Sequence, residues 1–172
     1  MTEINWVETL GTMKWTVSTF DCLVEAFRSA PTEESKGAML SIIGEFGSRL
    51  QVPDPEETTE PVPDEYKTLM DDWEQAQNKF EQWTILARMK DILTSFDCMV
   101  DAVRAASTQK SKRAVVRGIG KHRSEWSQMP SLEEMAEPEI ANEYKIMMDE
   151  WEQVEHKFEQ WALDEIPAVG SA

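Results

Sequence analysis

Apolar residues recur along most of this chain at alternating spacings of four and three, the period of an α-helix that buries one face. The first stripe predicts a helix over residues 6–27, and a related stripe predicts a helix over residues 86–103. We expect both stripes to be buried. They consist of Trp6, Leu10, Met13, Val17, Phe20, Val24 and Phe27 in the first helix and of Leu86, Met89, Leu93, Phe96, Val100 and Val103 in its counterpart.

The same spacing predicts two further pairs of helices. Thr32 and either Ser107 or Thr108 are suitable N-caps for the second pair, and Asp64 and Asn142 hold matched N-cap positions for the third pair. A stripe rich in Trp is more typical of a core than of a ligand site. The expected core residues are Met39, Ile43, Phe46, Leu50, Val115, Ile119 and Trp126 in the second pair, and Leu69, Trp73, Ala76, Phe80, Trp83, Met147, Trp151, Val154, Phe158 and Trp161 in the third.

The helices come in pairs because the sequence repeats. Residues 65–83 read EYKTLMDDWEQAQNKFEQW and residues 143–161 read EYKIMMDEWEQVEHKFEQW, with thirteen of the nineteen positions identical. Upstream, residues 13–50 align with residues 89–126. Gly44 and Gly120 match in this alignment, which predicts a close helix crossing in each copy. We interpret the repetition as duplication of a three-helix unit.

The two copies are expected to share one helix. No Gly or Pro occurs between Asp64 and Gly118, so a continuous helix can run from about Tyr66 to Ala106, roughly 60 Å at 1.5 Å per residue. The predicted fold is all-α: tandem duplicated three-helix bundles with a long continuous central helix, repeat 1 covering residues 1–86 and repeat 2 residues 87–172. This layout resembles that of spectrin-type repeats, although those are longer and the likeness does not extend to motif residues.

Composition changes this picture mainly through charge. The chain has 33 acidic and 17 basic residues and a net charge of −16, which on average repels nucleic acid and anionic membranes. Cys22 and Cys98 hold equivalent positions in the two copies, which favours buried apolar fillers in a reducing compartment over the alternative, a disulfide between them. The first residues do not resemble a signal peptide, and no apolar stretch approaches the length that spans a membrane. We therefore expect an intracellular protein, cytoplasmic or nuclear, without membrane contact.

Candidate chemistry for catalysis is sparse. His122 and His156 are the only histidines, and the other copy has Phe46 and Asn78 at their positions. Neither histidine forms the Glu-x-x-His pair of di-iron bundles. The two carboxylate-rich loops, residues 54–65 and 133–143, lack the spacing of a calcium-binding EF-hand. Phosphate-binding glycine loops, Cys-x-x-Cys pairs and nucleophile elbows are also absent from the sequence. We expect no enzyme activity, no cofactor and no metal.

The most informative difference between the copies is the charge of their second helices. Four positions that lie on one helical face become basic in the second copy. Glu34 corresponds to Lys110, Gly37 to Arg113, Ser41 to Arg117 and Glu45 to Lys121. Arg123 extends the face. A charged face is often only a solvated helix, but these changes occur in a chain whose solubility its acidic surplus already ensures. An acidic partner surface is therefore the natural interpretation.

The leading hypothesis is a non-catalytic interaction or scaffold protein that uses acidic repeat 1 and this basic face of repeat 2. The acidic surface could belong to another protein, to repeat 1 of a second copy in a homo-oligomer, or to phosphates. Trp15 is a candidate anchor, because it lies off the buried stripe and its counterpart is Asp91. The alternative function is an acidic mimic of nucleic acid that inhibits a DNA- or RNA-binding protein. Direct binding of nucleic acid is the least favoured, because most of the remaining charge would oppose it.

Overall fold

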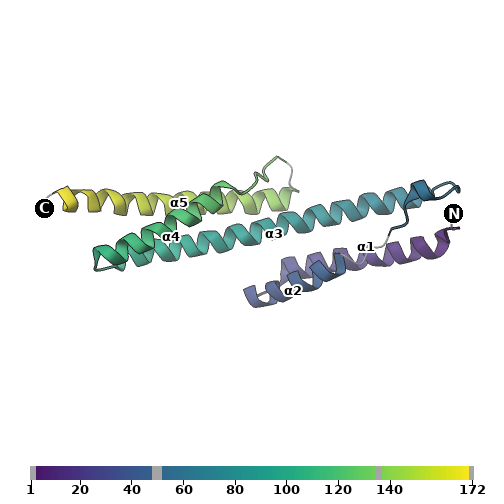
Figure 1. Cartoon of the computed structure of the whole chain (residues 1–172), viewed down its shortest axis with the longest axis horizontal. Coiled ribbons are helices and arrows are strands. Elements are labelled where there is room, and N and C mark those ends of the chain that lie inside the picture. The colour runs from purple at the N-terminus through teal and green to yellow at the C-terminus, as the bar shows by residue number, and fades with distance from the viewer. Residues whose placement is uncertain (1–2, 48–51, 135–136, 171–172) are drawn as a thin grey trace. The chain divides into compact units, whose positions relative to one another are not determined.

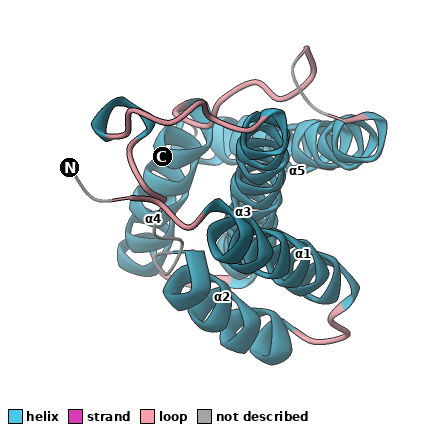
Figure 2. Cartoon of the chain, turned by 90° about the vertical axis from the view of Figure 1, so that its right-hand side faces the viewer, coloured by secondary structure: helices cyan, strands magenta, loops and turns pink. Residues whose placement is uncertain are grey.

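All the secondary structure in the described part of the chain is helical (Figures 1 and 2). The computed structural model describes residues 3–47, 52–134 and 137–170. These residues form two compact units, Met1–Glu81 and Gln82–Ala172, which are described separately below. The predicted all-α class is confirmed.

Unit 1 contains helix α1 (Trp6–Ser29), helix α2 (Glu33–Gly47), the short 3-10 helix η1 (Pro55–Glu57) and the first part of helix α3 (Asp64–Ala105). The predicted stripe of α1 packs against α3: the ring centroids of Phe20 and Trp73 lie 4.8 Å apart, and those of Trp6 and Tyr66 lie 5.4 Å apart. Helix α2 buries Ile43 and Phe46. The predicted core residue Leu50 lies outside the described residues.

Unit 2 contains the rest of α3, helix α4 (Gln109–Ser127) and helix α5 (Pro138–Gly170). One core joins all three helices, because residues of each belong to the same buried cluster. The indole rings of Trp126 on α4 and Trp151 on α5 stack at 4.2 Å, and Phe96 on α3 lies 4.6 Å from Trp151 between ring centroids. The stripe predicted over residues 86–103 is buried at all six of its positions.

The predicted helix from Tyr66 to Ala106 is confirmed, since α3 is continuous from Asp64 to Ala105. Two predicted N-caps are also confirmed. The hydroxyl oxygen of Thr32 accepts a hydrogen bond from the backbone N–H of Ser35, and that of Thr108 accepts one from Ser111, each at 3.1 Å. These bonds satisfy donors that a helix end otherwise leaves unpaired.

Three sequence predictions are wrong. The predicted N-caps of the third pair, Asp64 and Asn142, are not N-caps: α3 begins at Asp64 itself, and α5 begins a turn before Asn142, at Pro138, whose fixed φ suits a first helical turn. Gly44 and Gly120 mark no close crossing, because a Cβ at either position would meet no atom within 4 Å. Cys22 and Cys98 are exposed free thiols and do not fill the core.

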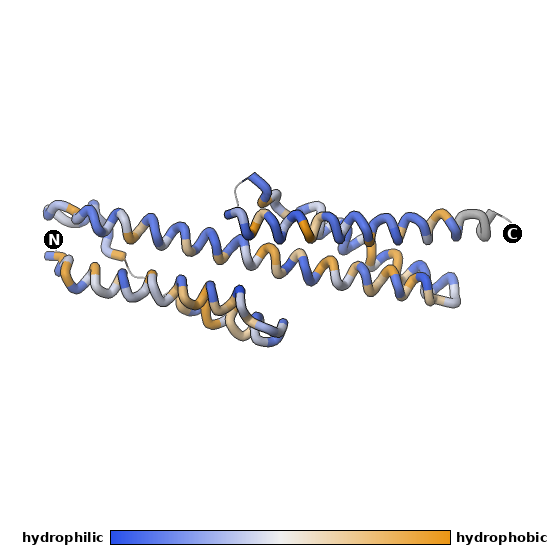
Figure 3. Tube along the Cα trace, turned by 180° about the vertical axis from the view of Figure 1, so that it is seen from behind, coloured by the Kyte–Doolittle hydropathy of each residue, from blue (hydrophilic) through white to orange (hydrophobic). Residues whose placement is uncertain are grey.

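Hydrophobic residues are spaced along each helix and do not form long continuous runs (Figure 3). Among the described residues, no helix combines the length and the apolar character needed to cross a membrane.

Candidate functional site

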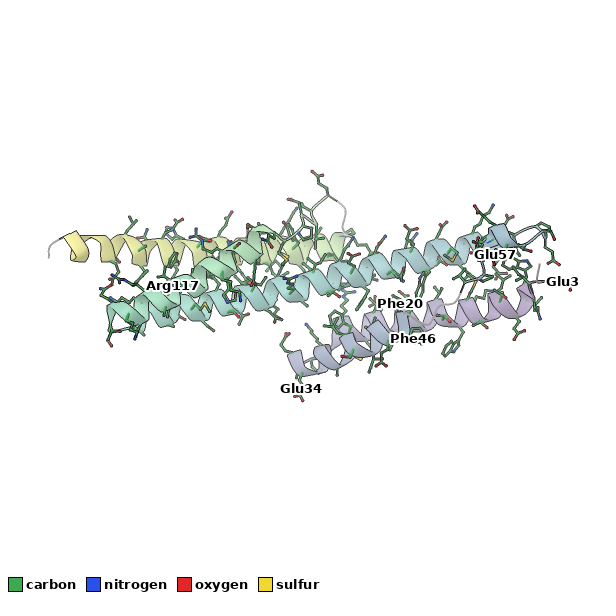
Figure 4. The ribbon with its side chains drawn as sticks, in the orientation of Figure 1. Glu3, Phe20, Glu34, Phe46, Glu57 and Arg117 are labelled. Atoms are coloured by element: carbon green, nitrogen blue, oxygen red, sulfur yellow. The ribbon has the colours of Figure 1, made fainter. Side chains whose placement is uncertain are left out.

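The four basic residues singled out by the comparison of the copies all project from α4 into solvent. Lys110, Arg113, Arg117 and Lys121 are exposed, and we call them the basic stripe (Arg117 is labelled in Figure 4). They follow one another at spacings of three, four and four, so they share a face of the helix. The opposite face of α4 buries Ile119 and Trp126 in the core of unit 2.

Neighbouring cations on α4 behave differently, because they pair with α5. The Lys112 ammonium donates to both carboxylate oxygens of Glu165, at 3.0 and 3.1 Å. The Arg123 guanidinium donates to Glu155 at 2.8 Å and lies 5.7 Å above the ring of Phe158. Arg123, which sequence reasoning grouped with the stripe, therefore also holds α4 to α5. Within the described residues, no ion pair engages any of the four stripe residues.

Other cations of the chain also form ion pairs with carboxylates of a neighbouring helix. In unit 1 the Lys79 ammonium donates to Glu25 at 2.8 Å, and this hydrogen bond holds the pKa of Glu25 below its usual value. In unit 2 Lys157 lies 2.9 Å from Asp101 and 3.1 Å from Asp97. Hydrogen bonds to these carboxylates raise the pKa of Lys157, and the bond from Lys157 lowers the pKa of Asp101. The stripe stands apart from these pairs because it leaves several positive charges together in water.

The position of the stripe also opposes the electrostatics of its own helix. A helix N-terminus carries a partial positive charge and favours acidic residues, as α2 shows with Glu33 and Glu34 in its first turn. The first turn of α4 has no acidic residue, and Lys110 stands there instead. The basic residues near this end therefore weaken the helix slightly, by a few tenths of a kcal/mol each. Helix stability does not account for their presence.

A groove between α4 and α5 lies beside the stripe. It encloses about 360 Å³ and includes Arg113 and Arg117 of the stripe together with Val116 and Trp161. The Lys112–Glu165 pair forms another part of its wall. Val116 is partly exposed although it is apolar. The groove, defined here as the α4–α5 groove, thus combines two cations without described partners and an apolar surface.

Sequence reasoning missed this groove because it depends on two helices. Trp161 belongs to the stripe predicted as core, and its ring does stack on Phe158 at 5.8 Å between centroids. The side chain is nevertheless only half-buried and also lines the groove. A Trp on the last part of a helical stripe is one signal that an apolar surface continues beyond the core.

Trp15, the candidate anchor in unit 1, is an exposed aromatic residue of α1. Its side chain is 64% exposed, and its ring lies 5.9 Å from that of Phe46 between centroids. The acidic residues that correspond to the ends of the basic stripe, Glu34 and Glu45, are exposed on α2. Glu34 projects away from the helices of unit 1 in Figure 4.

The two histidines lie on different helices of unit 2, His122 on α4 and His156 on α5. His122 is partly buried at the position equivalent to Phe46, with its Nδ1 atom 3.8 Å from a carboxylate oxygen of Glu125, and His156 is exposed. Among residues 3–47, 52–134 and 137–170, no group of three or more His, Cys, Asp or Glu side chains is placed to hold a metal ion.

A second hollow in unit 2, of about 450 Å³, lies between α3 and α5 and is lined by Cys98, Asp97 and Lys157. Its charged groups include the Lys157–Asp97 pair. The basic stripe with its adjoining groove is the better candidate for binding, because the four stripe cations have no described acidic partner.

Comparison of the chain with protein-family models, curated proteins and solved structures gave no match.

Proposed function

We propose that this chain is a non-catalytic protein–protein interaction protein whose basic stripe binds an acidic partner surface. The observation that carries the proposal is the contrast on α4 between paired and unpaired cations. Lys112 and Arg123 are held by α5, whereas the four stripe residues make no described ion pair in a chain with a net charge of −16. Charges placed this way steer a complementary surface into contact and set its orientation.

The proposed architecture is a duplicated three-helix unit. Equivalent positions of the two copies make similar contacts, which supports duplication. Phe20 and Trp73 in unit 1 correspond to Phe96 and Trp151 in unit 2, at centroid distances of 4.8 and 4.6 Å. The pair Lys79–Glu25 likewise corresponds to Lys157–Asp101. On this view the packing residues were retained while the second helices acquired opposite charge.

A test of the function compares captured partners and oligomeric state for three proteins. The first is the native chain. The second, the stripe variant, carries Arg113→Glu and Arg117→Glu. The third, the control variant, carries Lys67→Glu and Arg88→Glu, two exposed cations whose reversal changes the net charge by the same amount. We expect the stripe variant to lose a partner or an oligomeric state that the control variant keeps. An identical set of partners and an identical molar mass for all three proteins would contradict the proposal.

A second candidate function is mimicry of nucleic acid by unit 1. It is favoured by the charge of residues 1–81, which include 17 acidic and only 6 basic residues. A mimic of this kind would displace DNA-binding proteins from immobilised DNA without binding DNA itself. It would keep this ability in the stripe variant, because the acidic surface is unchanged there. If the chain instead works through the stripe, the stripe variant should lose its binding activity.

A further inference from the structure

The α4–α5 groove defines the chemistry of the surface that would fill it. Val116 and Trp161 provide an apolar wall, and Arg113 and Arg117 stand one helical turn apart beside it. Two guanidinium groups at this spacing suit carboxylates, and an aromatic ring between them would gain cation–π contact. The fitting occupant is therefore an exposed aromatic or aliphatic side chain with acidic neighbours.

Unit 1 of this chain carries such a surface. Trp15 is 64% exposed and Ile42 is 50% exposed. Ile42 lies one turn before Phe46, against which Trp15 packs, so both apolar residues border the same part of α1 and α2. Glu45 follows Ile42 by three residues, so these two exposed side chains are neighbours on α2, and Glu34 is exposed about two turns earlier on the same helix. We call Trp15 and Ile42, with these two carboxylates, the Trp15 patch.

The residues that distinguish the two surfaces are found in one copy of the repeat and replaced in the other. In the second copy, Asp91 and Gly118 stand at the positions of Trp15 and Ile42, so the exposed apolar residues are lost. Glu34 and Glu45 are replaced there by Lys110 and Lys121, so the acidic neighbours become basic. Because of these differences between the copies, one chain has an acidic aromatic surface on its first copy and a basic groove on its second.

We propose that the α4–α5 groove of one copy of this chain receives the Trp15 patch of a second copy. The inference deepens the proposed function, on which it rests, by naming the acidic partner. Trp15 would enter beside Val116 and Trp161, and the carboxylates of α2 would face Arg113, Arg117 and their stripe neighbours. Because unlike surfaces meet, the contact is heterologous, and repetition produces a ring or an open chain of copies.

Complementation between two defective chains tests this contact. The Trp15→Asp variant introduces the residue found at the equivalent position of the second copy, and it has an intact groove but a patch without its aromatic anchor. The Arg113→Glu/Arg117→Glu variant has an intact patch but no groove. All three altered side chains are exposed, so circular dichroism should show unchanged helix content. Light scattering after size exclusion then gives the molar mass of each protein and of their equimolar mixture.

We expect the native chain to exceed its monomer mass of 19.7 kDa, with an excess that falls as salt is added. Each variant alone should be monomeric. Their mixture should contain a species of twice the monomer mass and nothing larger, because only one intact patch and one intact groove remain to meet. Val7→Asp is the matched control: Val7 is 86% exposed on α1, outside the patch, and its substitution should leave the native mass unchanged.

A monomeric native chain, or a mixture that stays monomeric, would overturn the self-docking contact. Those results would leave the proposed function standing if the stripe variant still loses a foreign partner that the control variant retains. If the masses behave as expected but no foreign partner depends on the stripe, self-assembly is the interaction that the stripe serves. The two experiments thus separate failure of the contact from failure of the function.

Discussion

Aromatic side chains bear much of the packing in both units. Phe96 is fully buried, and its ring contacts both Trp151 and Phe158 on α5. Phe20 makes the corresponding contacts with Trp73 and Phe80 in unit 1. Aromatic pairs at these separations stabilise a core beyond the apolar area that they bury. The loss of one such ring should therefore lower the stability of its whole unit.

Replacing Phe96 by Ala should lower the free energy of unfolding of unit 2 by about 3–5 kcal/mol, because it removes the ring and leaves a cavity that α3 and α5 cannot close. Denaturant unfolding followed by tryptophan fluorescence measures the loss. Phe96→Leu serves as the milder comparison, because it keeps most of the apolar volume. A loss below about 0.5 kcal/mol for Phe96→Ala, the range of ordinary surface substitutions, would show that the ring is not packed as described.

Glu25 should contribute stability that depends on pH. Its pKa in the folded protein is lowered, first of all by the hydrogen bond from Lys79, so its ionised form is favoured by folding. The contribution is therefore complete above the usual pKa of 4.5 and is lost as the pH falls through the lower folded value. Since 46% of the Glu25 side chain is exposed, water screens the pair, and we expect only a few tenths of a kcal/mol.

The measurement is the difference in thermal midpoint between the native chain and Glu25→Gln at neutral pH and at a pH well below 4.5. The native chain should melt slightly higher at neutral pH, and the difference should shrink in acid. Glu74→Gln, at an exposed position of α3, controls for the change in net charge. A difference that grows as the pH falls would contradict the assignment of the pair.

Periodicity along single helices predicted much of what is seen. Most of the stripe predicted for α1 and all six residues predicted over 86–103 are buried, and Thr32 and Thr108 cap α2 and α4. Features that depend on a neighbouring helix were not accessible in this way. Cys22 and Cys98 are a separate case: each lies two residues from its nearest buried neighbours, off the apolar stripe of its helix, and both thiols therefore face solvent.

Glycine positions in α4 illustrate the same limit. Gly120 matches Gly44 in the other copy, but the close approach in α4 occurs at Gly118, where a Cβ would lie 3.1 Å from the Sδ and Cε atoms of Met99. Which glycine meets a neighbour depends on how α4 is turned against α3. A match between two copies cannot report that rotation.

Gly120→Ala should raise the free energy of unfolding of unit 2 by up to about 1 kcal/mol, because Ala favours a helix and the new Cβ meets open space. Gly44→Ala should do the same for unit 1. Gly118→Ala should yield a smaller gain, since Met99 has to shift. Thermal unfolding of the three variants orders them, and a destabilising Gly120→Ala would show that α4 is packed on that side.

Charge is unevenly divided along the whole chain. Residues 1–81 have 17 acidic and 6 basic side chains, whereas residues 82–172 have 16 acidic and 11 basic ones. The basic stripe on α4 was predictable from the sequence because the repeat supplies an internal comparison. The α4–α5 groove was not, because it requires Arg113 and Trp161 to come together from two helices.

The central claim is that the basic stripe is the surface that meets acidic partners. A labelled polyglutamate peptide tests this most directly, by fluorescence anisotropy with the native chain, the stripe variant and the control variant. The titration is made from about 0.01 M to about 1 M salt, over which the Debye length shortens from about 30 Å to about 3 Å.

We expect the native chain and the control variant to bind the peptide at low salt with similar affinity. Reversing Arg113 and Arg117 removes two attractive contacts and adds two repulsive ones, so the stripe variant should bind at least about tenfold more weakly, a difference of about 1.4 kcal/mol. Added salt should abolish binding of the native chain. Equal affinity of the stripe and control variants, or no binding of the native chain at low salt, would contradict the claim.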